Sequence, residues 1–329
     1  MRRLLGRRLL STLVSAIGAL LLVTLFLDLI PGDPVEILLG EQAQSVDRAQ
    51  LRQAMWLDRP VPEQAWLFVS ALIRGELASS LPPFRDLVLP HIWQALPRTA
   101  LLALLAMTLA TLVSLPLGIG SALRAGRPLD RAAMLLSVAG ISAPSFLVGH
   151  LLILLFGIRL GWFPISGDDH WTSVLLPAAT LAFGLSALLS RVTRVSMLEV
   201  LGEDYLVAAR ARGLSPRSIV LRHALRNALL PILTVVGLQL GAVLTGAIVV
   251  EKVFAWPGLG SLLLGAIEKR DYNTVRACVL VFTLTYLVVN LLTDLAYALA
   301  DPRVRRSGKG ATPDPDLAPD PGPRGEVVS

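Results

Sequence analysis

The sequence predicts an all-α polytopic membrane protein with six membrane-spanning helices. Hydrophobic residues make up 54% of the 329-residue chain and charged residues only 16%, whereas soluble domains carry roughly a quarter charged residues. The apolar residues also occur in blocks of about the 20 residues that a helix needs to cross a bilayer. These observations exclude a soluble multidomain enzyme and a wholly disordered chain. The single cysteine, Cys278, excludes a disulfide-stapled scaffold.

Each predicted span is one apolar block. The first block is too long for the apolar core of a signal peptide and lacks a small-residue cleavage site, so we expect an uncleaved anchor. The third block contains Pro144 and the fourth contains Pro177; membrane helices tolerate proline because neighbouring helices satisfy the freed backbone groups. The six blocks cover residues 9–30, 99–122, 132–158, 175–195, 229–250 and 277–299.

The basic residues predict that both termini face the cytoplasm. Four arginines precede the first span, and arginines recur in segments 123–131 and 191–228, whereas segment 159–174 contains only Arg159. Cytoplasmic loops of membrane proteins are enriched in Lys and Arg. We therefore expect a multi-pass membrane protein. The same clustering beside spans explains the net charge of +6 without a nucleic-acid partner.

The chain divides into three predicted parts. Residues 1–98 comprise the first span and an extracytoplasmic segment, in which residues 46–57 and 63–73 are each expected to form a short helix. Residues 99–300 form the core, with five spans. The cytoplasmic tail, residues 301–329, has six prolines and few apolar residues; because it cannot bury enough apolar surface to offset its ordering entropy, we expect disorder.

The loop at 198–228, between the fourth and fifth spans, has a distinct local design. Glu203 and Asp204 begin a predicted helix that ends near Arg212, which complements the helix dipole. Gly213 follows where a left-handed C-cap is favoured. Ser215 then N-caps a second helix, with proline at its first position. Two short helices at a sharp bend fit a groove on another protein; an amphipathic helix resting on lipid headgroups is the alternative interpretation.

This loop resembles the EAA loop of ABC importer permeases. The pattern Val207-Ala208-Ala209-x-x-x-Gly213, with Leu230-Pro231 farther on, carries the resemblance, although Val207 stands where the general motif has glutamate. The likeness covers about residues 4–306 and is closest to the dipeptide, oligopeptide and nickel group. The further motifs that resemble this group are Pro31-Gly32-Asp33-Pro34, Leu160-Gly161-Trp162-Phe163-Pro164, the run from Leu221 to Pro231, the run from Val253 to Gly260, and Asp301-Pro302-Arg303-Val304-Arg305.

The resemblance implies a type I ABC importer permease fold, in a bacterial or archaeal cytoplasmic membrane. It also implies a non-catalytic subunit that forms the path for dipeptides or oligopeptides by alternating access. The implied partners are a second homologous permease, two ATP-binding cassette subunits, an extracytoplasmic solute-binding protein and the lipid bilayer. ATP and Mg²⁺ would bind to the cassette subunits, because this chain has no P-loop. Import of nickel or of a glutathione-like solute by the same architecture stays open, and an ion-coupled carrier is the rival from another class.

The resemblance also indicates which residues of the loop couple to the ATPase. Ala208 and Ala209 are expected to lie in a tight groove on that subunit, where added volume would be costly. The full set of implied coupling residues is Glu203, Asp204, Ala208, Ala209, Arg212 and Gly213.

Polar residues inside the spans are candidates for the translocation path. Gln239 lies in the fifth span, and Asn290 and Asp294 lie four residues apart, on one face of the sixth. Hydrogen bonding between helices is an equal alternative for all three. The pair Gly237 and Gly241 predicts close packing of the fifth span against a neighbouring helix, such as one of the partner permease.

The sequence indicates neither a metal site nor an active site. Asp168-Asp169-His170 offers at most half of a metal site, and we interpret it as a solvated polar loop. Ser145 and His150 suggest an intramembrane serine protease only superficially, because five residues place them about 140° apart around a helix.

Overall fold

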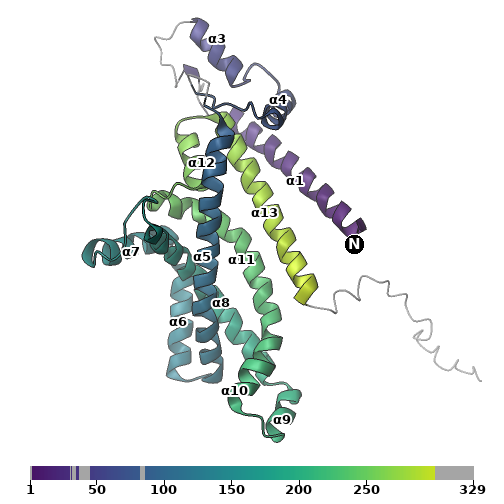
Figure 1. Cartoon of the computed structure of the whole chain (residues 1–329), viewed down its shortest axis with the longest axis vertical. Coiled ribbons are helices and arrows are strands. Elements are labelled where there is room, and N and C mark those ends of the chain that lie inside the picture. Colours follow the sequence, from purple (N-terminus) through teal and green to yellow (C-terminus); the bar gives the residue numbers. More distant parts are fainter. Residues whose placement is uncertain (1, 30, 32–34, 37–44, 82–85, 301–329) are drawn as a thin grey trace, which may run out of the picture.

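Helices dominate the described part of the chain, which in this computed structural model comprises residues 2–29, 31, 35–36, 45–81 and 86–300 (Figure 1). The N-terminal helices are α1 Arg2–Asp28, α3 Ser45–Ala54, α4 Val61–Arg74, α5 Val88–Leu123 and α6 Pro128–Ser142. Next come α7 Ser145–Leu152, the π-helix η1 Ile153–Arg159, the short η2 Trp171–Val174, and α8 Leu175–Leu201. The remainder are α9 Asp204–Ala211, α10 Pro216–Ser218, the π-helix η3 Ile219–Ala224, α11 Leu225–Val253, α12 Leu259–Glu268 and α13 Tyr272–Ala300.

Among the described residues, four helical stretches are long and apolar enough to cross a bilayer. They match the second, fourth, fifth and sixth predicted spans and run over Val88–Leu123, Trp171–Leu201, Pro216–Val253 and Tyr272–Thr293. The first predicted span coincides with α1, whose apolar stretch Val14–Leu27 is shorter than these. The predicted tail, residues 301–329, lies outside the described residues.

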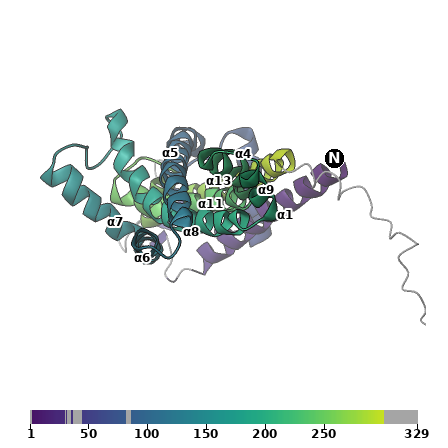
Figure 2. The same ribbon diagram turned by 90° about the horizontal axis from the view of Figure 1, so that it is seen from below.

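The third predicted span is broken rather than continuous. Helix α6 and the stretch Ser145–Arg159 meet at an angle of 106°, so that α7 points away from α6 (Figures 1 and 2). Ala143 and Pro144 are both in the extended conformation. Pro144 has no N–H to donate to the preceding turn, and its ring disfavours helical backbone at the residue before it. The expectation that the helix would absorb this proline was wrong.

Helix α8 lies at the centre of the core, packing most extensively against α5 and then against α11 and α6. Small residues allow this close approach. A Cβ added to Gly118 of α5 would sit 2.7 Å from the carbonyl oxygen of Ser190 on α8, and one added to Gly140 of α6 would sit 2.7 Å from the Cβ of Ala187. The core is therefore held at distances that larger side chains would not permit.

Helix α1 packs beside α13 and also contacts α4, away from the α5–α8 centre (Figure 1). Leu20 and Leu27 of α1 are buried in a second apolar cluster, together with Phe68 of α4 and Val275 of α13. The two helices predicted for the extracytoplasmic segment are present as α3 and α4. Gly75 ends α4 with a φ of 73°, in the left-handed conformation that glycine adopts readily.

A buried carboxyl group joins three of these helices. Glu251 of α11 is fully buried and accepts a hydrogen bond of 2.6 Å from the hydroxyl of Thr99 on α5. It also accepts bonds from the backbone N–H groups of Gly260 and Ser261, at 2.7 and 3.0 Å, in the first turn of α12. Acidic groups are favoured at a helix N-terminus, where N–H groups lack partners inside the helix. Glu251 thus fixes the start of α12.

We predict that Gly260→Ala destabilises the fold by about 1–3 kcal/mol through overpacking. An added Cβ would lie 2.6 Å from the Cα of Ile248 and 2.9 Å from Oε2 of Glu251. Gly265→Ala on the same helix is the matched control, because its Cβ would meet nothing within 4 Å, and alanine is the better helix former. The thermal unfolding midpoint in detergent should fall for Gly260→Ala alone; equal midpoints for the two variants would contradict this packing.

Candidate functional site

The loop between α8 and α11 forms the sharp bend that the sequence predicts. Helix α9 begins at Asp204, and Gly213 has a φ of 75°, in the left-handed region. The hydroxyl of Ser215 accepts a hydrogen bond from the N–H of Ser218, at 3.4 Å, and Pro216 occupies the first turn of α10. The predicted second helix leads directly into the fifth span. It continues through η3 into α11, forming one stretch from Pro216 to Val253.

Five of the six candidate coupling residues are exposed, and the sixth faces inward. The exposed ones are Glu203, Asp204, Ala208, Arg212 and Gly213. Ala209 is only 2% exposed in this chain alone. It therefore has almost no surface left for a groove on another subunit, in contrast to the expectation from the sequence. Its position on the inner face of α9 makes it a packing residue of the loop.

Two contacts fix α9 to the rest of the chain. Leu206 is fully buried in an apolar cluster with Met197 of α8 and Ala228 of α11. The side-chain amide of Asn227 donates a hydrogen bond of 2.7 Å to the hydroxyl of Tyr205. Neither contact was predicted, because each joins α9 to a residue outside the loop helix itself. Helix α9 is consequently attached to α8 and to the start of α11.

A buried ion pair anchors α8 just before this loop. The guanidinium of Arg194 donates two hydrogen bonds to the carboxylate of Asp130, at 2.5 and 2.8 Å. The hydroxyl of Ser121 and the backbone N–H of Gly126, the latter at 2.9 Å, also donate to Asp130, which is 3% exposed. These four donors leave the carboxylate fully satisfied. The pair ties α8 to the turn between α5 and α6.

The three candidate path residues lie on two adjacent helices. Gln239 of α11 and Asn290 of α13 are partly buried, and their side chains make no hydrogen bond within the described part of the chain. The side chain of Asp294 lies outside the described residues.

The glycine pair of α11 faces α13 of the same chain. A Cβ on Gly237 would lie 3.2 Å from the Cβ of Thr293, and one on Gly241 would lie 2.9 Å from a ring carbon of Tyr286. The prediction of close packing is confirmed, but the neighbour is an intrachain helix rather than the partner permease.

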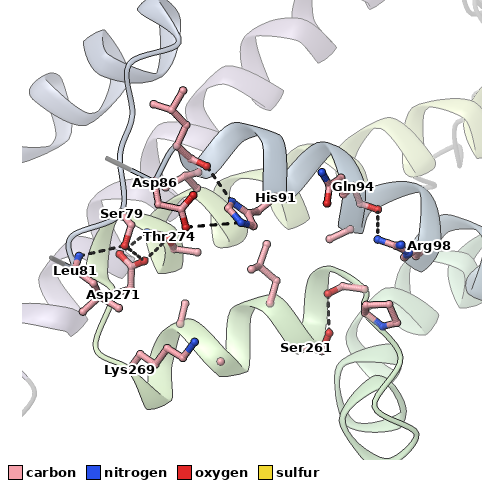
Figure 3. A pocket seen from close by; sticks show the side chains of 18 residues that line it. Ser79, Leu81, Asp86, His91, Gln94, Arg98, Ser261, Lys269, Asp271 and Thr274 are labelled. Atoms are coloured by element: carbon pink, nitrogen blue, oxygen red, sulfur yellow. Dashed lines mark hydrogen bonds and ion pairs between the residues drawn. The ribbon is translucent and has the colours of Figure 1, made fainter. Parts of the chain in front are cut away.

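Helix α12 and the start of α5 lie at the end of the bundle opposite α9 (Figure 1). A groove of about 420 Å³ opens between α12 and the first turns of α5 (Figure 3). Small residues of α12, including Gly265 and Ala266, form one wall. We call this cavity the α5–α12 groove. Its polar lining residues are Ser79, Asp86, His91, Gln94, Arg98, Ser261, Lys269, Asp271 and Thr274.

Asp271 lies at one end of the groove, and its carboxylate is already hydrogen-bonded by other residues of this chain. Its carboxylate accepts hydrogen bonds from the hydroxyls of Ser79 and Thr274, at 2.7 and 2.6 Å, and from the N–H of Ser80, at 2.8 Å (Figure 3). Asp271 is 6% exposed and lies directly before α13. Its role is to join the segment before α5 to the start of α13.

The acidic loop that the sequence offered as half of a metal site has another contact. Asp168 forms an ion pair of 2.7 Å with the guanidinium of Arg98 on α5. Within the residues that the structure describes, no three side chains of the metal-ligating types gather at one place. Asp168 therefore links this loop to α5.

Comparison with known proteins identifies the family. Residues 114–306 match the family described as "Binding-protein-dependent transport system inner membrane component", and residues 1–102 match its N-terminal membrane component family. The chain belongs to this family. It is a transport permease subunit and not an enzyme.

The permease is similar over most of its length to named relatives. It is 41% identical over 300 residues to the glutathione transport system permease protein GsiC of Pectobacterium atrosepticum. It is 40% identical over 299 residues to the proteins of the same name from Salmonella typhi and Escherichia coli K12. Each alignment covers 91% of this chain and 97% of the relative. The family resemblance that the sequence motifs carried is confirmed.

The fold of the permease is also found in a solved transporter. An inward-facing structure of the MetNI methionine ABC transporter superimposes with a TM-score of 0.56 over 64% of this chain and 98% of that chain, at 16% identity. This likeness confirms the predicted type I ABC importer permease fold.

We predict that Asp130→Asn lowers the stability of the permease by about 3 kcal/mol, since it leaves a partly buried arginine without its anionic partner. The unfolding midpoint in detergent should fall by several degrees. Arg191→Gln is the matched control, because Arg191 lies on the same helix and is exposed. If both variants unfold at the wild-type temperature, Asp130 and Arg194 do not form the anchor described above.

Proposed function

We propose that this permease and a second homologous permease form the path of an importer for short peptide-like solutes, with glutathione the first candidate. An extracytoplasmic binding protein would deliver the solute. Two cassette subunits, which would bind ATP and Mg²⁺, would drive transport through the loop at 198–228. In this arrangement the loop and both termini face the cytoplasm, and α3, α4 and the α5–α12 groove lie on the outer side.

The observation that carries this proposal is the exposed bend of α9 and Gly213, together with its firm attachment to the core. Leu206 and Tyr205 join α9 to α8 and α11, and Arg194 joins α8 to the α5–α6 turn. A subunit that displaces α9 would therefore move the long helices with it. ATP can shift the equilibrium between two such arrangements only by as much as it binds one of them more tightly than the other.

The named relatives support the choice of substrate class. They are described as glutathione transport permeases, which favours a peptide-like solute over nickel. Membership of the binding-protein-dependent family favours the ATP-driven importer over the rival ion-coupled carrier, which would need no separate ATPase.

Substitutions on the two faces of α9 should separate coupling from packing. Ala208 is exposed and Ala209 buried, so Ala208→Leu should leave the unfolding midpoint of the purified permease unchanged, whereas Ala209→Leu should lower it by overpacking. If Ala208 meets the ATPase closely, an overpacking cost of about 1–3 kcal/mol corresponds to roughly 5- to 150-fold weaker engagement. Binding-protein-stimulated ATP hydrolysis and glutathione uptake should then fall together in proteoliposomes that contain the complete complex.

The matched control for Ala208→Leu is Ala125→Leu, at an exposed alanine in the other predicted cytoplasmic turn. Gly213→Val should resemble Ala208→Leu in activity, because a β-branched residue resists a φ of 75°. Uptake that survives these substitutions and the removal of ATP, and that follows an ion gradient instead, would overturn the proposed ATP-driven mechanism.

The proposed orientation predicts labelling from opposite sides of the membrane. Gln53 in α3 and Arg217 in α10 are both exposed. A cysteine introduced at Gln53 should react with a membrane-impermeant maleimide only from the outside, and one at Arg217 only from the cytoplasm. The native Cys278 is fully buried and should give little background in the wild-type control. Labelling of both positions from one side would refute the orientation.

A further inference from the structure

We infer that the α5–α12 groove is a receiving site for a short zwitterionic peptide, where solute released on the outer side first contacts this permease. The inference rests on the proposed function and specifies where and how its substrate class is recognised. Three features of the groove support such a site: its shape, the polar groups left free in it, and the connection of its α12 wall to the loop.

The shape of the groove suits a small extended solute. Its volume of about 420 Å³ falls within the range of roughly 300–1,000 Å³ typical of small-molecule sites. Gly265 lies in the α12 wall, and a Cβ added there would meet nothing within 4 Å. The wall therefore allows a solute backbone to approach α12 closely, and a larger side chain at this position would occupy the cavity without disturbing the helix.

The charged groups of the groove fall into two classes, those used by the protein and those free for a solute. Asp271 is saturated by its hydrogen bonds, and Arg98 is paired with Asp168. By contrast, Lys269 and the side-chain amide of Gln94 have no partner within the described residues. A lysine ammonium and an amide on facing walls are suitable donors for a carboxylate.

The groove also offers groups for the other end of a peptide. Among the described residues, the carboxylate of Asp86 contacts only the imidazole of His91, at 3.7 Å (Figure 3), so it can still accept hydrogen bonds from an ammonium group. Free positive and negative groups in one cavity complement a solute that carries both charges. A short peptide has this chemistry, with amide groups between its charged ends.

The α12 wall is connected to the energy-coupling side of the permease. Glu251 fixes the first turn of α12 to the outer end of α11, and the helix that contains α11 begins at Pro216 beside the loop. A displacement of the loop would thus carry the α12 wall with it. A site here is placed to hold solute in one arrangement and to release it in the other.

The test uses the complete complex in proteoliposomes with saturating solute-loaded binding protein. The probes are glutathione and its glycine monoethyl ester, which lacks one carboxylate. Lys269→Gln should lower glutathione uptake per ATP hydrolysed by about tenfold, because it removes a charge-assisted hydrogen bond. Uptake of the ester by the same variant should stay close to its wild-type level. Gly265→Leu should block both probes and preserve binding-protein-stimulated ATP hydrolysis.

The matched controls change similar residues outside the groove. Lys252→Gln alters an exposed lysine that pairs with Glu268, and neither residue lines the groove. Gly18→Leu alters a glycine of α1 whose Cβ would also meet nothing within 4 Å. Both should leave the uptake ratio of the two probes at its wild-type value.

Two results from the groove variants would overturn the inference. Wild-type uptake of both probes by Gly265→Leu and Lys269→Gln would show that solute does not pass through the groove. Equal loss of uptake and of stimulated ATP hydrolysis would identify the groove as a contact surface for the binding protein instead. A wild-type complex that takes up neither probe would refute the proposed substrate class itself, and with it this assignment.

Discussion

The close approach of α8 to α5 is the constraint on which the rest of the fold depends. Helices in a membrane gain little from the hydrophobic effect between them, so they associate through close packing and a few polar contacts. Gly118 allows α5 to approach Ser190 and Thr193 of α8 closely. Because α8 also contacts α11 and α6, its position on α5 determines where those helices can lie. The loop at one end and the α5–α12 groove at the other take their places from this arrangement.

Polar contacts stabilise the bundle at its two ends, whereas apolar packing stabilises its middle. Asp130 and Arg194 join helices near the loop, and Glu251 and Thr99 join helices near the groove. Asp130, Glu251 and Thr99 are buried and Arg194 is partly buried. Each of the two carboxylates accepts several hydrogen bonds, which offsets the free-energy cost of burying it. Such pairs also restrict how neighbouring helices can slide past one another, because movement would leave a buried polar group without a partner.

Features determined by a few neighbouring residues could be predicted from the sequence, and features determined by distant contacts could not. The bend at Gly213 and the cap at Ser215 follow from local backbone preferences, and the spans follow from apolar length. Glu251 was missed because its partner Thr99 lies 152 residues away. The break at Pro144 was misjudged for a related reason. Whether a helix absorbs a proline depends on neighbours that the sequence does not place.

The continuous stretch Pro216–Val253 has a mechanical consequence. Its 38 residues correspond to a rod of about 57 Å at the helical rise of about 1.5 Å per residue. If such a rod pivots at one end, a tilt of about 5° moves the other end by about 5 Å, which is close to the length of one helical turn. Amplification of this kind means that the ATPase of the proposed complex need not perform a large movement. A rotation of about 5° at Pro216 would displace Glu251, near the other end of the stretch, by about 5 Å.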